Sequence, residues 1–136
     1  MIMSAEATAA AEDTEIRFEE GIIGVPRARR FELLERKDSP IRVLRCLDID
    51  GFALPVVDPL LADTTYRPVL GPRVHEALLL EAGEPVLLLA VTTLEPTGPV
   101  ANLRAPLVIN VKLRLAKQVI LDDRAYPLRA PLAAPR

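Results

Sequence analysis

Tryptophan is absent from this chain of 136 residues, and there is only one cysteine, Cys46, and one histidine, His75. A single cysteine excludes an internal disulfide framework and is typical of a reducing compartment. Metal sites need three or four converging Cys, His or carboxylate ligands, and these two soft groups lie far apart in the sequence. We therefore expect no disulfide, no metal and no cofactor.

Long apolar runs are also missing. No stretch approaches the roughly 18 consecutive apolar residues that a membrane-spanning helix needs. The first residues lack a basic segment followed by an apolar one, so no secretory signal peptide is predicted. We expect a cytoplasmic protein that does not contact membranes.

A catalytic constellation is not recognisable either. His75 lies on a predicted helix and is interpreted as a solvated or packing residue, and Cys46 lies in an apolar strand and is interpreted as a core residue. Acid/base chemistry would need a carboxylate held in an apolar site, whereas the aspartates at predicted turns fit turn and cap roles. These aspartates are Asp48, Asp50, Asp58, Asp63, Asp122 and Asp123. We predict that the protein is not an enzyme.

What the chain does have is short apolar segments separated by turn residues. Half of its residues are hydrophobic and 13 are prolines, so the core must be built mainly from Leu, Val, Ile and Ala. Turn signals every 8–12 residues favour a sandwich or small barrel over an α/β fold. We predict a mainly β, barrel-like antiparallel domain of about seven strands over residues 15–132, with a disordered leader (1–14) and a tail (133–136). Residues 71–85 are the one predicted helix, and Pro55 favours an edge or bulge position for the strand around it.

Residues 101–121 have the clearest period of two. The pattern places one set of apolar residues on a single face: Leu107, Ile109, Val111, Leu113 and Leu115. Such alternation is typical of a strand with one buried and one wet side. We place the hairpin turn at residues 115–117, with residues 117–121 returning antiparallel.

Asn102 and Asn110 are unusual in a strand pattern, where Asn is depleted. Their side-chain amides must face water or bond internally. One interpretation is that they fix a bulge or loop by bonding backbone groups. The other is that they lie on a surface that meets a partner.

Charge is distributed unevenly. Residues 1–20 carry six acids against Arg17 alone, and residues 101–136 carry seven Lys or Arg against Asp122 and Asp123. A basic C-terminal third raises a second hypothesis, a barrel-like nucleic-acid-binding module that uses the C-terminal hairpin. Against it, no aromatic residues are interleaved with the basic ones to stack on bases.

Four segments, in order along the chain, resemble one known family. They are IRFEEGIIGVP (16–26), PVVDP (55–59), ANLRAPLVIN (101–110) and KQVILDD followed by YPLR (117–129). Together they resemble the FliW family of flagellar assembly factors. The resemblance implies a small, mostly β, non-catalytic cytoplasmic protein that binds flagellin. It also implies binding and antagonism of the RNA-binding translational regulator CsrA, so that secretion of flagellin frees the protein to bind CsrA.

Six residues are the candidates for a partner interface. We predict that partners are bound through Glu19, Glu20, Asn102, Asn110, Asp122 and Tyr126. The acidic excess near residue 20 is compatible with a basic partner. No direct contact with nucleic acid is expected, and the free protein is expected to be a monomer. The family's hairpin usually has Gly where Ala116 stands, so a different turn is expected here.

Overall fold

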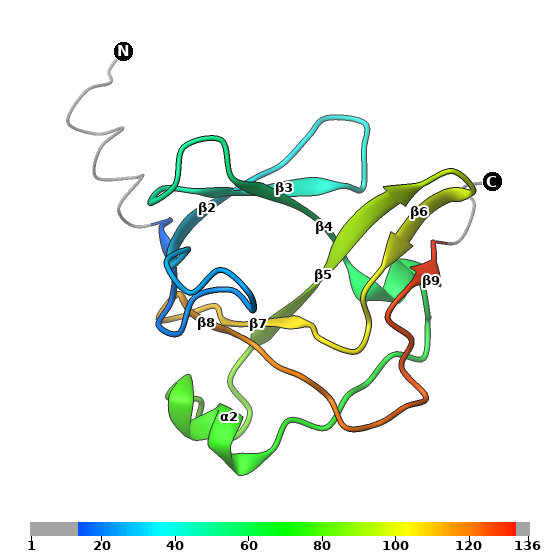
Figure 1. Ribbon diagram of the computed structural model, residues 1–136. Helices are drawn as coiled ribbons and strands as arrows, with labels where there is room; N and C mark the ends of the chain where they lie inside the picture. The colour runs from blue at the N-terminus through cyan, green and yellow to red at the C-terminus, as the bar shows by residue number, and fades with distance from the viewer. Residues whose placement is uncertain (1–13, 133–136) are drawn as a thin grey trace.

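The computed structural model describes residues 14–132, which form a β-barrel with two short helical segments (Figure 1). The elements are β1 (Ile16–Phe18), β2 (Arg30–Leu34), β3 (Arg42–Cys46), β4 (Ala53–Val57), η1 (Pro59–Leu61), α2 (Pro72–Ala77), β5 (Val86–Glu95), β6 (Gly98–Ala101), β7 (Leu107–Asn110), β8 (Leu115–Gln118) and β9 (Ala130–Pro131). The sheet order is β4-β3-β2-β1-β8-β7-β5-β6-β9, and an additional β4–β5 pairing closes the barrel. Strands β6 and β9 extend from the second half of β5, outside the closed ring.

The predicted fold class, a mainly β barrel with one short α-helix, is confirmed. One detail of it is wrong, because β1 and β8 run parallel, with Arg17 opposite Leu115 and Phe18 opposite Ala116. The ring contains β1, β2, β3, β4, β5, β7 and β8. An odd number of strands cannot alternate direction all the way around a closed barrel, so one parallel pair is unavoidable.

The barrel interior is filled by aromatic and aliphatic side chains. Phe18 and Phe31 are fully buried, and their rings meet edge to face with centroids 5.3 Å apart. Leu44, Leu89 and Leu107 pack around them. Cys46 belongs to the same cluster, which confirms its interpretation as a core residue.

A second cluster lies beneath the segment between β6 and β7. Tyr66 and Tyr126 stack edge to face with ring centroids 4.9 Å apart. The Tyr66 hydroxyl donates a hydrogen bond to the carbonyl oxygen of Leu103 at 2.7 Å, and burial raises the pKa of this phenol. The cluster therefore packs Leu103, near the start of the last third of the chain, together with Ala130, near its end.

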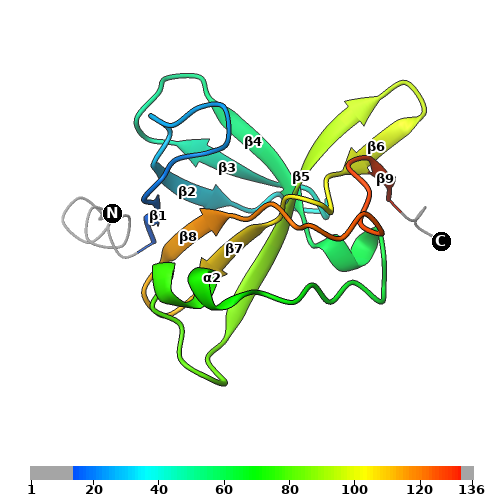
Figure 2. The same cartoon turned by 60° about the horizontal axis from the view of Figure 1, so that its bottom comes forward.

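Helix α2 covers one side of the barrel through Val74 and Leu78, which pack on Val108 (Figure 2). It ends at Ala77, earlier than predicted, since Leu79 adopts a left-handed backbone with φ of 54°. His75 lies on this helix, as predicted, and it is half-buried. Within residues 14–132, no helix is long and apolar enough to cross a membrane.

The predicted hairpin turn at residues 115–117 is wrong. Strand β7 ends at Asn110, the turn occupies residues 111–114, and Ala116 lies inside β8 opposite Ile109. The left-handed residue of the turn is Arg114, with φ of 60°. Val111 and Leu113 are 45% and 47% exposed, so the inward face predicted for residues 107–115 does not continue past Ile109.

The period of two wrongly predicted a strand with one buried and one wet side, because β7 is buried on both sides. Leu107 and Ile109 face the barrel interior, whereas Val108 packs beneath α2. The predicted antiparallel pairing of the two halves of the hairpin is nevertheless correct. The predicted leader and tail lie outside the described residues, except for Thr14.

Candidate functional site: an apolar groove at the barrel mouth

An open groove of ≈ 480 Å³ lies where β4 and β5 separate. The two strands pair only through Val56 and Val57, and beyond that point they splay apart (Figure 2). The predicted edge position of the strand around Pro55 is wrong for β4 as a whole, because β4 pairs with β3 on one side and with β5 on the other. Pro55 itself pairs only with Val43 of β3 and precedes the β4–β5 pairing. We call this hollow the apolar groove; its lining is Ile22, Ile23, Val25, Phe52, Leu54, Val91, Asn102, Arg104, Ala105, Gln118, Ile120 and Leu128.

The floor of the apolar groove is a large bulge between β6 and β7. Both strands pair with β5: Ala101 lies opposite Thr92 and Leu107 opposite Leu89. Two residues of β5 therefore face five residues, 102–106, and three extra residues loop out of the ladder. Bulges of this kind redirect side chains at barrel rims.

Asn102 holds this bulge in shape. Its backbone N–H donates to the carbonyl of Val91 at 2.9 Å, which continues the ladder. Its side-chain Oδ1 accepts the backbone N–H groups of Arg104 and Ala105 at 3.0 and 3.1 Å. These bonds are the ones expected if Asn102 fixes a bulge by bonding backbone groups, and the same residue also lines the groove.

A tight loop between β1 and β2 forms another wall. Ile22 and Val25 pair as an isolated bridge, which points Ile23 outward with 52% of its surface exposed. Gly21 begins the loop with φ of 72°, and a Cβ atom there would lie 2.4 Å from the carbonyl oxygen of Pro26. Only glycine fits this position without a shift of the backbone.

Gln118 joins the loop to the bulge. Its Oε1 accepts the backbone N–H of Ile23 at 2.9 Å, and its Nε2 donates to the carbonyl of Ala105 at 3.2 Å. One side-chain amide in β8 thus connects segments that are remote in sequence. The groove is therefore held in shape before any ligand arrives, which reduces the ordering cost of binding.

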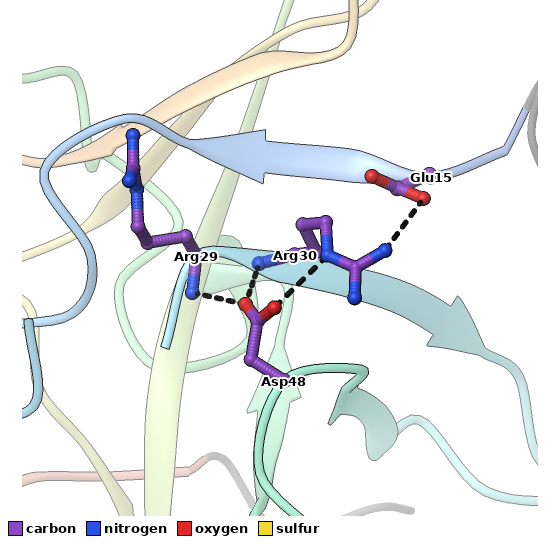
Figure 3. A network of polar contacts seen from close by, with 4 residues as sticks. All are labelled: Glu15, Arg29, Arg30 and Asp48. Atoms are coloured by element: carbon purple, nitrogen blue, oxygen red, sulfur yellow. Dashed lines mark hydrogen bonds and ion pairs between the residues drawn. The ribbon is translucent and has the colours of Figure 1, made fainter. Parts of the chain in front are cut away.

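The base of the β1–β2 loop is fastened by a charged network (Figure 3). Asp48 accepts the backbone N–H groups of Arg29 and Arg30 at 2.9 and 2.8 Å, and the Nε of Arg30 at 2.9 Å. The side-chain hydrogen bond from Arg30, with the two backbone bonds, lowers the pKa of Asp48 from 3.8 to about 2. Glu15 lies 3.9 Å from the other side of the Arg30 guanidinium.

The remaining wall comes from the segment after β8. Leu121 donates its backbone N–H to the carbonyl of Arg104, and Arg104 Nε donates to the carbonyl of Tyr126, both at 2.8 Å. These bonds place two aliphatic residues on the groove rim, Ile120 at 65% and Leu128 at 54% exposure. The Arg104 guanidinium donates to the backbone carbonyls of Tyr126 and Arg124, which hold it in place, and it is the one charged side chain among the described residues that line the groove.

A second hollow, of ≈ 800 Å³, lies on the other side of the same segment. We call it the charged hollow; its lining is Arg67, Val69, Gly71, Pro72, Arg73, Val74, Val119, Ile120, Leu121, Asp122, Asp123 and Tyr126. Arginines are on the wall formed by residues 67–74, and aspartates on the wall formed by residues 119–126. Ile120 lines both hollows.

The residues predicted to bind partners are dispersed over the surface. Asn102 lines the apolar groove, whereas Asp122 and Tyr126 line the charged hollow. Glu19 and Glu20 are exposed and form ion pairs with Arg29 at 3.3 Å and with Lys117 at 2.5 Å. Their binding roles stay predictions.

Asn110 is fully buried. Its Nδ2 donates to the carbonyl of Leu78 at 2.8 Å, and its Oδ1 accepts the N–H groups of Lys112 and Leu113 at 3.0 and 3.2 Å. The side chain thus closes the β7–β8 turn and ties it to the end of α2. Partner contact through Asn110 would require this turn to open.

Sequence reasoning missed Ile23, Ile120 and Leu128. A usable signal existed for Ile120, because alternation with the buried neighbour Leu121 predicts an outward side chain. All three residues also lie inside segments that carry the family resemblance. Exposed aliphatic residues in those segments, rather than polar ones, mark the groove.

Carboxylates form ion pairs with several of the cationic side chains in the C-terminal third. Lys112 lies 3.7 Å from Glu84, and Arg129 forms two hydrogen bonds with Glu95, which lower the pKa of that carboxyl. Lys117 is held by Glu20. These ion pairs weaken the basis of the nucleic-acid hypothesis, which relied on an uncompensated basic hairpin.

Most turn aspartates serve the backbone, as predicted. Asp58 accepts the N–H of Leu60 at the start of η1, Asp63 accepts that of Thr65, and Asp123 accepts that of Ala125. Within residues 14–132, no three His, Cys, Asp or Glu side chains gather as metal ligands would.

Comparison with known proteins points to one family. The family model described as "FliW protein" matches residues 3–132. "Flagellar assembly factor FliW" of Thermosipho africanus is 34% identical over 122 residues, covering 87% of this chain and 84% of the relative. The protein of the same name from Bdellovibrio bacteriovorus is 32% identical, covering 86% and 69%. A crystal structure of the flagellar assembly factor FliW superposes with a TM-score of 0.84 at 32% identity, covering 90% of this chain and 88% of that one. The chain belongs to the FliW family.

Proposed function

We propose that this protein is a flagellar assembly factor that acts by binding other proteins and not by catalysis. Support comes from its relatives, which carry that name, and from a surface organised for binding. Backbone hydrogen bonds accepted by the side chains of Gln118, Asn102 and Asp48 hold the groove in shape. Its lining is aliphatic and aromatic, with few polar groups, as in sites that receive apolar side chains.

The flagellar partner in this proposal is flagellin, bound in the cytoplasm through the apolar groove. The observation that supports this assignment is that three of the four segments with the family resemblance meet at the groove. Residues 16–26, 101–110 and 117–129 all contribute lining side chains, although they are distant in sequence. Burial of an exposed isoleucine or leucine contributes about 1.5–3 kcal/mol when complete, so a few rim residues are enough for specific binding.

The second partner in this proposal is the RNA-binding regulator CsrA, which the protein antagonises. Flagellin and CsrA would share a limited pool of the protein, so that export of flagellin releases it for CsrA. When two ligands exclude one another, removal of one raises the apparent affinity for the other. Flagellin synthesis would thereby follow secretion.

A pull-down from flagellated cells tests the proposal. The tagged protein is expected to recover flagellin and CsrA, with more CsrA when flagellin is deleted. The Leu128→Asp variant should lose flagellin, whereas Leu94→Asp, on an exposed leucine outside the groove, should retain it. Recovery of neither partner by the unmodified chain would contradict the proposal.

A further inference from the structure

We propose that the apolar groove selects a partner segment that presents a carboxylate beside its aliphatic side chains, and that Arg104 binds this carboxylate. The inference deepens the proposed function and rests on it for the identity of the partner, flagellin. Its starting point is a contrast within the groove: among the described residues that line it, Arg104 alone carries a charge.

The charge of Arg104 has no anionic partner within residues 14–132. Its Nε donates to the carbonyl oxygen of Tyr126 at 2.8 Å and its Nη2 to that of Arg124 at 3.5 Å, and both acceptors are neutral. No ion pair between described residues includes Arg104. By comparison, Arg30 and Arg129 each contact a carboxylate. The Arg104 guanidinium is therefore held in place without being neutralised.

The unused part of this guanidinium has the shape that a carboxylate fits. The bonds to Tyr126 and Arg124 use the side of the guanidinium formed by Nε and Nη2. At its end, N–H groups of Nη1 and Nη2 point the same way, and they have no acceptor within residues 14–132. Such an edge binds a carboxylate through two parallel, charge-assisted hydrogen bonds.

Arg104 bonds to both segments that carry the exposed aliphatic rim of the groove. Its carbonyl accepts the backbone N–H of Leu121, the neighbour of Ile120. Its Nε donates to Tyr126, which lies two residues before Leu128. Ile120 and Leu128 are 65% and 54% exposed. A segment that packs aliphatic side chains on these two residues therefore brings its neighbouring groups close to the guanidinium.

Burial of the Arg104 charge decides which segments the groove accepts. Arg104 is already partly buried, and a bound segment would remove more of its water. A cation that loses water without an anionic partner is costly to bury, whereas a paired carboxylate offsets that cost. A purely apolar or basic segment is therefore disfavoured, and an acidic segment with aliphatic side chains is favoured. The aliphatic rim supplies affinity, and Arg104 supplies selectivity.

Calorimetric titration of purified flagellin from the same organism into the full chain tests the inference. Arg104→Met keeps an aliphatic side chain and removes the charge, so flagellin should bind at least tenfold more weakly at low salt. The difference from the unmodified chain should shrink at high salt, because ions screen the pair. Arg36→Met, on an exposed arginine outside the groove, is the matched control and should leave the affinity unchanged. A thermal melt checks that each variant is folded.

Changes in flagellin identify the carboxylate. Hydrogen exchange locates the flagellin segment that binding protects, and each acidic side chain in that segment is replaced by the corresponding amide. A flagellin with an amidated C-terminus distinguishes a terminal carboxylate from a side-chain one. One of these changes should weaken binding to the unmodified chain at least tenfold and have no further effect on Arg104→Met, because losses are not additive for two groups in contact.

Three results would overturn the inference and leave the proposed function intact. The first is an unchanged affinity for Arg104→Met. The second is a loss that is equal at all salt concentrations, which would show that Arg104 only braces the Tyr126 carbonyl. The third is an additive loss for every change in flagellin. Failure of the unmodified chain to bind flagellin would overturn both the inference and the proposed function.

Discussion

The side-chain oxygen of Gln118 accepts the backbone N–H of Ile23 at 2.9 Å, across 95 positions of sequence. The same amide donates to Ala105 and so connects the β1–β2 loop, the bulge and β8. Three of the four segments that carry the family resemblance, residues 16–26, 101–110 and 117–129, therefore meet at one groove. Each of the three supplies part of its lining, and Gln118 connects them through its two hydrogen bonds.

Replacement of Gln118 by Met keeps the side-chain length and removes both hydrogen bonds. We expect a loss of about 1–3 kcal/mol in the free energy of unfolding, since two backbone groups lose their partner. Amide exchange at Ile23 should accelerate as well. Gln118→Glu is the comparison: it still accepts from Ile23 and cannot donate to Ala105, so exchange at Ile23 should stay slow. Equal exchange rates in both variants would contradict the role given to this bond.

Gly21→Ala should destabilise the protein more than Gly24→Ala does. Both glycines have positive φ, 72° and 86°, so both substitutions incur the left-handed penalty of about 1 kcal/mol. Only at Gly21 would the new Cβ meet backbone, at 2.4 Å from the oxygen of Pro26, whereas nothing lies within 4 Å at Gly24. Urea denaturation of the two variants isolates the clash, and equal midpoints would show that the loop adapts.

Acid should weaken the attachment of the β1–β2 loop through Asp48. Its folded-state pKa of about 2 lies below the ordinary value of 3.8, so its contribution to stability is present above 3.8 and is lost as pH falls toward about 2. Asp48→Asn should be less stable than the unmodified protein at neutral pH, and the two should converge across that window. Thermal midpoints measured against pH check this, and parallel curves would show that Asp48 contributes nothing there.

Asn110→Ala should destabilise the fold by about 1–3 kcal/mol, because the fully buried side chain bonds to three backbone groups and its bond to the carbonyl of Leu78 lies in the interior, where water cannot replace it. Asn102→Ala should have a smaller effect, since Asn102 is only partly buried. Denaturant midpoints give both values. A fully stable Asn110→Ala variant that had lost partner binding would instead support the interface role predicted for this residue.

Much of the fold could be predicted from local patterns, since short apolar segments between turn residues correctly indicated a small barrel and its one helix. The turn at residues 111–114 could not, because Asn110 sets it by folding its side chain back onto Lys112 and Leu113. Period-two alternation also fails for β7, whose two faces meet different clusters. The bulge at residues 102–106 appears only when the register of both neighbours on β5 is known.

The candidate site was harder to predict for a related reason. The residues predicted to bind partners carry polar groups, yet Asn102 and Asn110 bond mainly to backbone, and Glu19 and Glu20 are paired with cations. The groove depends on aliphatic residues such as Ile23, Ile120 and Leu128, which look like core residues until a fold exposes them. Tertiary packing decides whether such a side chain is exposed, and the local sequence does not specify that packing.

The central proposal is that flagellin binds in the apolar groove. A titration of flagellin into the Leu128→Asp and Leu94→Asp variants tests this proposal most directly. Both changes place a carboxylate on an exposed leucine, and only Leu128 lines the groove. We predict at least a tenfold weaker affinity for Leu128→Asp, about 1.4 kcal/mol or more, and an unchanged affinity for Leu94→Asp. Equal affinities for the two variants would contradict the account.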